Sequence, residues 1–239
     1  MQWQTVEKGI FCALRPQYWP HLRKGVAPAI EHLGPLSRFD FRTVVDVGAN
    51  RGQFALMARS LFPAAQIYSF EPLSGPAAVY RALLSGDERI HLFDTAIGAS
   101  SGQVKMYVTT RDDSSSMLKP GVAQDEIFGV QASRVDEVSI ARLSECVPAA
   151  RIERPALLKI DVQGAELTVL EGAADMIDAF DAIYVECSYL QLYDDQPLIA
   201  DIARWTDQHG FRLAGVYNQH DDPKRGPVQA DFLFLNARA

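Results

Sequence analysis

The sequence is poor in the features that mark secreted, membrane-spanning and metal-clustering proteins. It has three cysteines, Cys12, Cys146 and Cys187, and no C-x-x-C pair, so we expect a reducing compartment and no zinc cluster built on cysteine. No apolar run approaches the ~18 residues that span a bilayer, and the N-terminus lacks the apolar core of a signal peptide. We therefore expect a cytoplasmic protein without a transmembrane segment.

Positive charge is also scarce. Lys and Arg number 23 against 30 Asp and Glu, which gives a formal net charge of −7. Because no run of basic residues offsets this balance, nucleic acid is not an expected partner. Repeats and flexible linkers are absent as well, and 239 residues that are 48% hydrophobic suit one α/β domain with a packed core.

An alternation of strands and helices begins after residue 40. Apolar strand patterns occupy residues 44–47, 66–70, 90–93, 156–160 and 183–185, and helical patterns occupy 52–61, 75–84, 165–170 and 198–208. Such alternation predicts a parallel sheet covered on both faces. A last pair of strands, 212–216 and 232–235, with turn residues at 221–226, suits an antiparallel edge. The fold class is therefore a doubly wound α/β domain with a seven-stranded, mostly parallel sheet.

Two segments fall outside this alternation. Residues 103–143 alternate polar and apolar side chains, which predicts a β insertion resembling a hairpin, joined by a loop at 110–132. Residues 1–40 are broken by prolines and contain helical patterns near 3–14 and 21–33. We expect them to form an N-terminal helical cap on the domain at 41–239.

The strongest motif is VVDVGANRGQF at 44–54, where a buried strand turns into a helix. Gly48 and Gly52 let a ligand approach the backbone at the carboxyl edge of the sheet. The dinucleotide fingerprint G-x-G-x-x-G is not met, because Asn50 replaces its second glycine and the third is missing. Asp46 at the strand tip would repel a pyrophosphate and favour a cationic ligand such as S-adenosylmethionine, with its ammonium and sulfonium groups.

Two acidic residues follow the next two strands. Glu71 comes about 20 residues after the glycine turn, where an acidic residue can accept both ribose hydroxyls. NAD sites share this feature, and a solvated glutamate is the alternative. Asp94 is a candidate acceptor for the adenine amino group, although an aspartate that starts a turn is common.

The segment LKIDVQGAE at 158–166 ends the fourth strand of the alternation. Asp161 at its tip should face the same crevice as Asp46, with capping of the following helix as the alternative role. Lys159 lies inside a strand, so it should have a carboxylate partner if it is buried.

Taken in order, VDVGANRGQF, SFEP and LKIDVQGAE resemble the FkbM-type family of S-adenosylmethionine-dependent O-methyltransferases. The resemblance covers residues 42–188, and QADFLF at 229–234 resembles the closing strand of the family. Residues 1–40 carry no part of it. The resemblance implies the class I methyltransferase type of sheet and S-adenosylmethionine as cofactor. It also implies a set of cofactor-binding residues: Asp46, Gly48, Asn50 and Gly52 for the methionine part, Glu71 for the ribose, and the loop around Asp94 for the adenine.

Methyl transfer to a hydroxyl of a small-molecule or glycan acceptor needs a base that takes the hydroxyl proton. The candidates at the carboxyl edge are Asp161, Glu186 and His220, and a solvated loop histidine is the alternative for the last. Asp161 and Glu186 are also oxygen ligands suited to a divalent metal, but no compact ligand motif is present, so a metal is not favoured. The polar segment 111–117 is a candidate part of the acceptor site.

Two other functions remain open at this point. One is an NAD-dependent oxidoreductase on a related fold, against which Asp46 and the missing third glycine count. The other is a module that binds S-adenosylmethionine without catalysis, against which the set of Asp46, Glu71 and Asp161 counts mildly.

Overall fold

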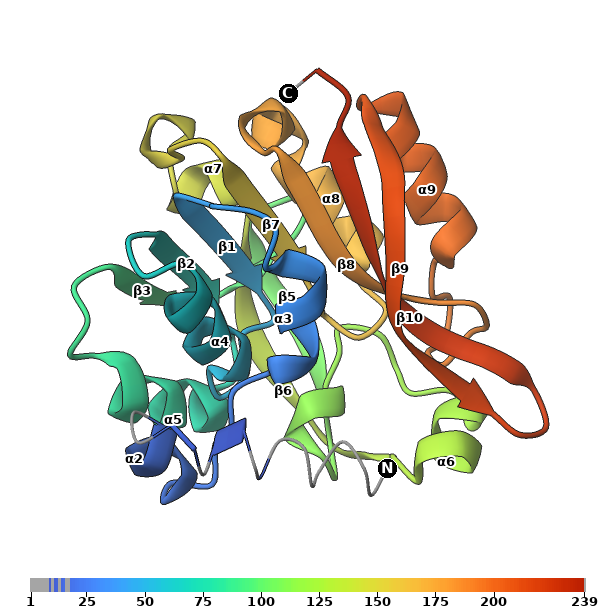
Figure 1. The fold of residues 1–239 in the computed structure, drawn as a ribbon. Coiled ribbons are helices and arrows are strands. Elements are labelled where there is room, and N and C mark those ends of the chain that lie inside the picture. The colour runs from blue at the N-terminus through green and yellow to red at the C-terminus, as the bar shows by residue number, and fades with distance from the viewer. Residues whose placement is uncertain (1–8, 10, 13, 16–17, 239) are drawn as a thin grey trace.

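The computed structural model describes residues 9, 11–12, 14–15 and 18–238 (Figure 1). Its main sheet has seven strands in the order β3-β2-β1-β7-β8-β10-β9. These are β1 (Thr43–Val47), β2 (Gln66–Phe70), β3 (Ile90–Phe93), β7 (Ala156–Ile160), β8 (Ala182–Ser188), β9 (Phe211–Asp222) and β10 (Gly226–Asn236). Strand β10 runs antiparallel to both its neighbours, β8 and β9, and the other pairs of the main sheet are parallel. The predicted doubly wound, mostly parallel sheet is therefore confirmed.

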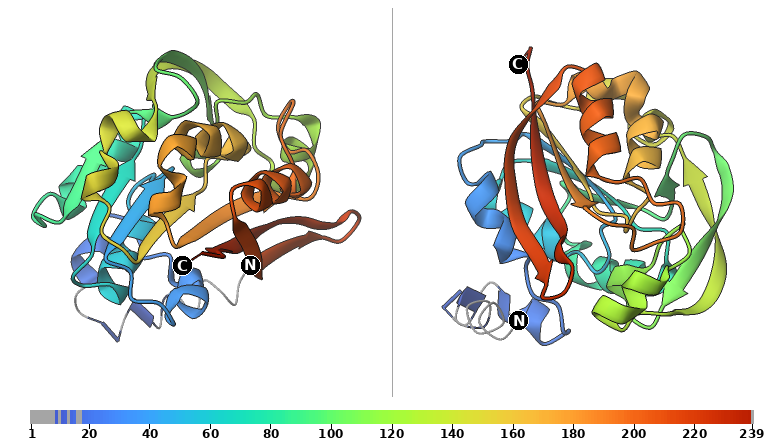
Figure 2. Two further views of the ribbon diagram at one scale, coloured as in Figure 1. Left: turned by 90° about the horizontal axis from the view of Figure 1, so that it is seen from above. Right: turned by 90° about the vertical axis from the view of Figure 1, so that its right-hand side faces the viewer.

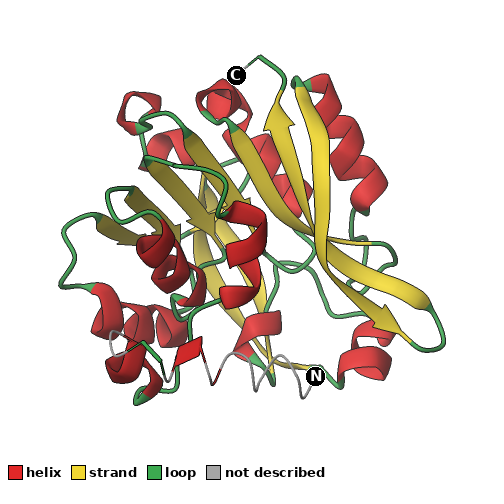
Figure 3. Ribbon diagram, in the orientation of Figure 1, coloured by secondary structure: helices red, strands yellow, loops and turns green. Residues whose placement is uncertain are grey.

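Helices cover both faces of the sheet (Figures 2 and 3). One apolar core includes residues of α3 (Leu33–Leu36), α4 (Gln53–Leu61) and α5 (Ser74–Leu84). The other includes residues of α7 (Leu143–Cys146), α8 (Glu166–Ala173), η5 (Ala174–Ala179) and α9 (Ile199–Gln208). Val44 of β1 belongs to the first core, whereas Val45 and Val47 belong to the second. This partition shows how the strand pleat sends successive side chains to opposite faces.

The predicted β insertion is confirmed, with additions. Strands β5 (Gly102–Thr109) and β6 (Ala132–Ala141) pair antiparallel, and β4 (Ala96–Ile97) joins β6 to make a second, three-stranded sheet. The connection between β5 and β6, which we expected to be a loop, contains η3 (Asp112–Ser114) and α6 (Val122–Phe128). The insertion stands beside the main sheet (Figure 2).

The helix predicted at 21–33 is wrong. The chain forms α2 (Trp19–Leu22), then leaves the helical conformation, and becomes helical again only at η2 (Ile30–His32) and α3. Gly25 adopts a left-handed φ of 74° in this interruption, and Pro28 lacks a backbone donor. Elsewhere in the chain, one further short helical turn, η4 (Ala149–Arg151), precedes β7. The helix expected near 3–14 falls mostly outside the described residues.

The described part of the first 40 residues is built into the main core. Val26 and Leu36 are buried in the same apolar cluster as Phe54 of α4. Within the described residues, no helix has the length and apolar character needed to cross a membrane.

Candidate active site

A cleft opens where β1, β2 and β7 end. Its floor is formed by residues 47–50, 70–73 and 161–163, which follow these three strands. Residues of the N-terminal segment, among them His32, line one side, and residues of the β insertion, among them Met106 and Met117, line another. Parallel strands bring their carboxyl ends to one edge, so the cleft lies where ligands bind in doubly wound folds.

Gly48 is required by a close contact between two chain segments. Its φ is 82°, and a Cβ placed there would lie 1.8 Å from the backbone oxygen of Asp161. Only glycine lets the turn after β1 pass this close to the end of β7. The turn therefore exposes bare backbone to the cleft.

Glu71 and Asn50 form the next part of the floor. The Glu71 carboxylate accepts hydrogen bonds from the backbone N–H of Asn50 at 2.9 Å and of Leu73 at 2.8 Å. Burial raises the pKa of Glu71 to about 7, against the opposing effect of these hydrogen bonds. The side-chain oxygen of Asn50 is buried and has no hydrogen-bond partner among the described residues. The floor thus offers both a carboxylate and an unpaired amide oxygen.

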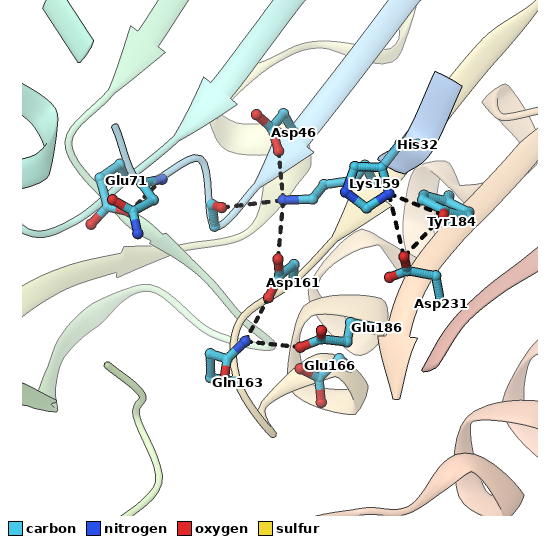
Figure 4. A network of polar contacts seen from close by, with 12 residues as sticks. His32, Asp46, Glu71, Lys159, Asp161, Gln163, Glu166, Tyr184, Glu186 and Asp231 are labelled. Atoms are coloured by element: carbon cyan, nitrogen blue, oxygen red, sulfur yellow. Dashed lines mark hydrogen bonds and ion pairs between the residues drawn. The ribbon is translucent and has the colours of Figure 1, made fainter. Parts of the chain in front are cut away.

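Lys159 has the carboxylate partner expected for a buried lysine. Its Nζ lies 3.0 Å from Asp46 Oδ1 and 3.7 Å from Asp161 Oδ2, and it donates to the Gly48 carbonyl at 3.2 Å (Figure 4). Burial opposes the charge on Lys159, but the carboxylates outweigh it and raise its pKa above the ordinary value. Burial also raises the pKa of Asp46, against the effect of Lys159.

Asp46 itself lies beneath the cleft and not in its lining. Its side chain is fully buried, and its charge is balanced by Lys159. The expected repulsion of a pyrophosphate by a free Asp46 charge therefore does not describe this site. The physical reason is that Asp46 and Lys159 are paired in register across β1 and β7, on the face covered by α4.

Asp161 lines the cleft and is held by two neighbours, Lys159 and Gln163. Gln163 donates to Asp161 at 2.8 Å and to Glu186 at 2.9 Å (Figure 4). Gln229 donates to the other Glu186 oxygen. Burial and the charge of Asp161 raise the pKa of Glu186. Helix α8 begins at Glu166 without a side-chain cap, so Asp161 does not cap it.

Besides Asp46, four expected site residues lie outside the lining of the cleft: Gly52, Asp94, Glu186 and His220. Gly52 precedes α4 with a φ of 92°, and a Cβ there would meet Tyr80. Asp94 is exposed and paired with Arg81, although the next three residues, 95–97, line the cleft. His220 is exposed on β9, where its ring centroid lies 5.0 Å from that of Phe128.

Sequence reasoning missed a second polar group at the cleft. His32 lines the cleft, and its Nδ1 lies 3.1 Å from the hydroxyl oxygen of Tyr184 and 3.3 Å from Asp231 Oδ2. Asn218 donates to the same Asp231 oxygen at 2.7 Å. His32 and Asp231 stand near opposite ends of the sequence, so no motif could have joined them.

A group of three or more His, Cys, Asp or Glu side chains placed to hold a metal ion is not found in the part of the chain that the structure describes.

Comparison with known proteins identifies the family. A family model described as the methyltransferase FkbM domain matches residues 46–213. The chain belongs to this family. The matched segment includes the turn after β1, Glu71 and Asp161, and it excludes His32 and Asp231. The match favours a methyltransferase over an NAD-dependent oxidoreductase.

Three proteins to which this chain is similar are named as methyltransferases. The 2-O-methyltransferase NoeI of Sinorhizobium fredii is 30% identical over 64% of this chain and 66% of its own length. The methyltransferase sdnD of Sordaria araneosa is 33% identical over 54% and 59%, respectively. The 31-O-demethyl-FK506 methyltransferase FkbM of Streptomyces tacrolimicus is 26% identical over 71% and 72%. The chain thus spans just under two thirds of the first relative and less of the second.

Proposed function

We propose that the protein transfers a methyl group from S-adenosylmethionine to a hydroxyl group of a small-molecule or glycan acceptor. The observation that carries this proposal is the cleft floor, where the bare backbone at Gly48 lies beside the buried carboxylate of Glu71. Two relatives support oxygen as the methylated atom, since their names are 2-O-methyltransferase and 31-O-demethyl-FK506 methyltransferase.

The residues of the floor fit the cofactor. Glu71 is the acceptor for the ribose hydroxyls, and residues 95–97, next to Asp94, are the side of the cleft proposed for the adenine. The unpaired oxygen of Asn50 and the backbone at Gly48 suit the methionine part, with its ammonium group. Asp46 and Gly52 act indirectly in this proposal, because they support the turn from beneath.

The acceptor would enter on the side of the β insertion. Asp113, Ser115 and Met117 line the cleft there, and they belong to the polar segment expected to bind the acceptor. When bound, S-adenosylmethionine supplies a methyl group on a positively charged sulfur, open to in-line attack by an oxygen. Asp161 is proposed to accept a hydrogen bond from the acceptor next to the reacting oxygen, and so to orient that oxygen. Glu186 positions Gln163, and His220 has no role in the proposal.

The first test is the choice of cofactor. Calorimetric titration should show binding of S-adenosylmethionine and of its demethylated product, but not of NAD. A screen of hydroxylated glycans and natural products with labelled donor should then give labelled product. Binding of NAD alone would overturn the proposal, whereas donor binding without turnover on any acceptor would favour a non-catalytic module.

Replacement of Glu71 by alanine is expected to lower the affinity for S-adenosylmethionine at least about tenfold, because charge-assisted hydrogen bonds of ~1.5–3 kcal/mol each are lost. The matched control is Glu88→Ala, at an exposed position outside the cleft. Since the pKa of Glu71 is raised to about 7, its carboxylate form increases from about pH 6 to pH 8, and parental affinity should rise over that interval. An unchanged dissociation constant in Glu71→Ala would contradict this role.

Replacement of Asp161 by asparagine is expected to lower kcat about 10- to 100-fold and to leave cofactor affinity nearly unchanged, because one charge-assisted hydrogen bond to the acceptor is weakened. Single-turnover measurements with the acceptor from the screen would show this, with the exposed Asp207→Asn as control. Activity of the parent is expected to survive a chelator. A fully active Asp161→Asn enzyme would remove Asp161 from the reaction.

A further inference from the structure

His32 is held at the cleft by four elements that are distant in sequence. It ends η2, its side chain is 15% exposed, and its ring centroid lies 5.4 Å from the rings of both Phe54 and Tyr184. Its Nδ1 is the atom that contacts Tyr184 of β8 and Asp231 of β10 (Figure 4). Asn218 of β9 lies 3.3 Å from the same nitrogen. The ring therefore has little freedom to rotate.

The hydrogen bonds around Asp231 determine which ring nitrogen carries the proton. Tyr184 donates its hydroxyl proton to Asp231 at 3.0 Å, and Asn218 donates to the same oxygen. The hydroxyl oxygen of Tyr184 and the carboxylate of Asp231 thus both face Nδ1 as acceptors. Asn218 Nδ2 also lies 3.3 Å from Nδ1, but its two hydrogens have acceptors in Asp231 and the Tyr184 hydroxyl. We therefore assign the proton of a neutral His32 to Nδ1, which leaves the lone pair on Nε2.

Nε2 has the surroundings of a base. It has no hydrogen-bond partner among the described residues, and the side chain lines the cleft. Burial raises the pKa of Asp231, but the hydrogen bonds from His32, Asn218 and Tyr184 outweigh burial and lower it below the ordinary value. An ionised Asp231 is the partner that stabilises an imidazolium.

We propose that His32 is the general base that takes the proton of the acceptor hydroxyl, with Asp231 as the positioning residue that orients its ring. The proposal rests on the methyltransferase function proposed above. Asp161 is less suited to this step, because its carboxylate is already engaged by Lys159 and Gln163.

The acceptor O–H proton passes to Nε2 of His32 while the oxygen forms a bond to the methyl carbon. The bond between that carbon and sulfur breaks, and its electron pair stays on sulfur, which leaves the neutral thioether product. The imidazolium formed at His32 then releases its proton to solvent.

The primary test is His32→Gln, assayed with S-adenosylmethionine and the acceptor from the screen. A positioned base contributes about 10²–10⁴-fold, so kcat should fall within that range, and the dissociation constant of S-adenosylmethionine should stay within about threefold. The acid limb of the parental kcat profile, measured with saturating S-adenosylmethionine so that ionisation of Glu71 does not contribute, should disappear in the variant. The matched control is His91→Gln, since His91 lies on β3 outside the cleft lining.

Asp231→Asn separates positioning from proton transfer. An amide can donate to Nδ1 and so reverse the tautomer, which should lower kcat while the acid limb remains. The other titratable or charged groups that face His32 are Tyr184, Lys159, Asp46 and the neighbouring Glu31, and they stay constant across these variants.

A second measurement does not depend on turnover or on the folding of a variant. ¹⁵N NMR of histidine-labelled parent, saturated with the demethylated cofactor product, should show a neutral imidazole protonated on Nδ1. The opposite tautomer, or an active His32→Gln enzyme, would overturn this inference and leave the proposed function standing. Failure of the parent to bind S-adenosylmethionine would instead overturn the proposed function.

Discussion

Replacement of Gly48 by alanine should destabilise the protein by about 2–5 kcal/mol and abolish measurable binding of S-adenosylmethionine. The left-handed φ of 82° penalises any side chain, by about 1–2 kcal/mol. The new Cβ would also lie 1.8 Å from the Asp161 carbonyl oxygen, which is a backbone atom that no rotamer change can move. Overpacking of this kind costs about 1–3 kcal/mol more.

The measurements are the melting temperature and the dissociation constant of S-adenosylmethionine. Separation of the turn after β1 from the end of β7 would also break the hydrogen bond from Lys159 to the Gly48 carbonyl. Gly86→Ala is the matched control, because a Cβ at that position meets nothing within 4 Å. Parental affinity in Gly48→Ala would show that the close contact is not needed for cofactor binding.

Replacement of Lys159 by methionine should cost about 3–5 kcal/mol at neutral pH, because it leaves Asp46 buried without a counter-charge. Burial already raises the pKa of Asp46, and loss of the lysine raises it further. At a pH between the pKa of Asp46 in the unfolded chain and its higher pKa in the native protein, Asp46 holds a proton in the native state but not in the unfolded state. Stability of the variant should therefore fall as pH rises, and part of it should return on acidification.

Urea unfolding at several pH values would measure this effect. The exposed Lys105→Met is the control for loss of a lysine. Adding Asp46→Asn to Lys159→Met should remove the extra pH dependence, since the buried group can no longer ionise. A Lys159→Met protein as stable as the parent at every pH would mean that Asp46 is uncharged in the parent.

The sheet was predictable because each strand is a short apolar run with a local boundary. Strands β2, β3 and β7 begin and end at the predicted residues. Helix α6 was missed and the helix at 21–33 was wrong, since short elements in irregular segments depend on packing more than on local pattern.

The sequence by itself determined the α/β fold, the family and the three turns that form the cleft floor, because parallel strands bring their carboxyl ends to one edge. Only the tertiary structure decided which side chains reach the cleft. Asp46 and Asp161 are both expected in the cleft, yet Asp46 lies within β1 and is fully buried, whereas Asp161 follows the end of β7 and lines the cleft. The contact of His32 with Asp231 joins η2 to the penultimate strand in sheet order, β10, and contacts between such distant segments exist only once the whole sheet has assembled.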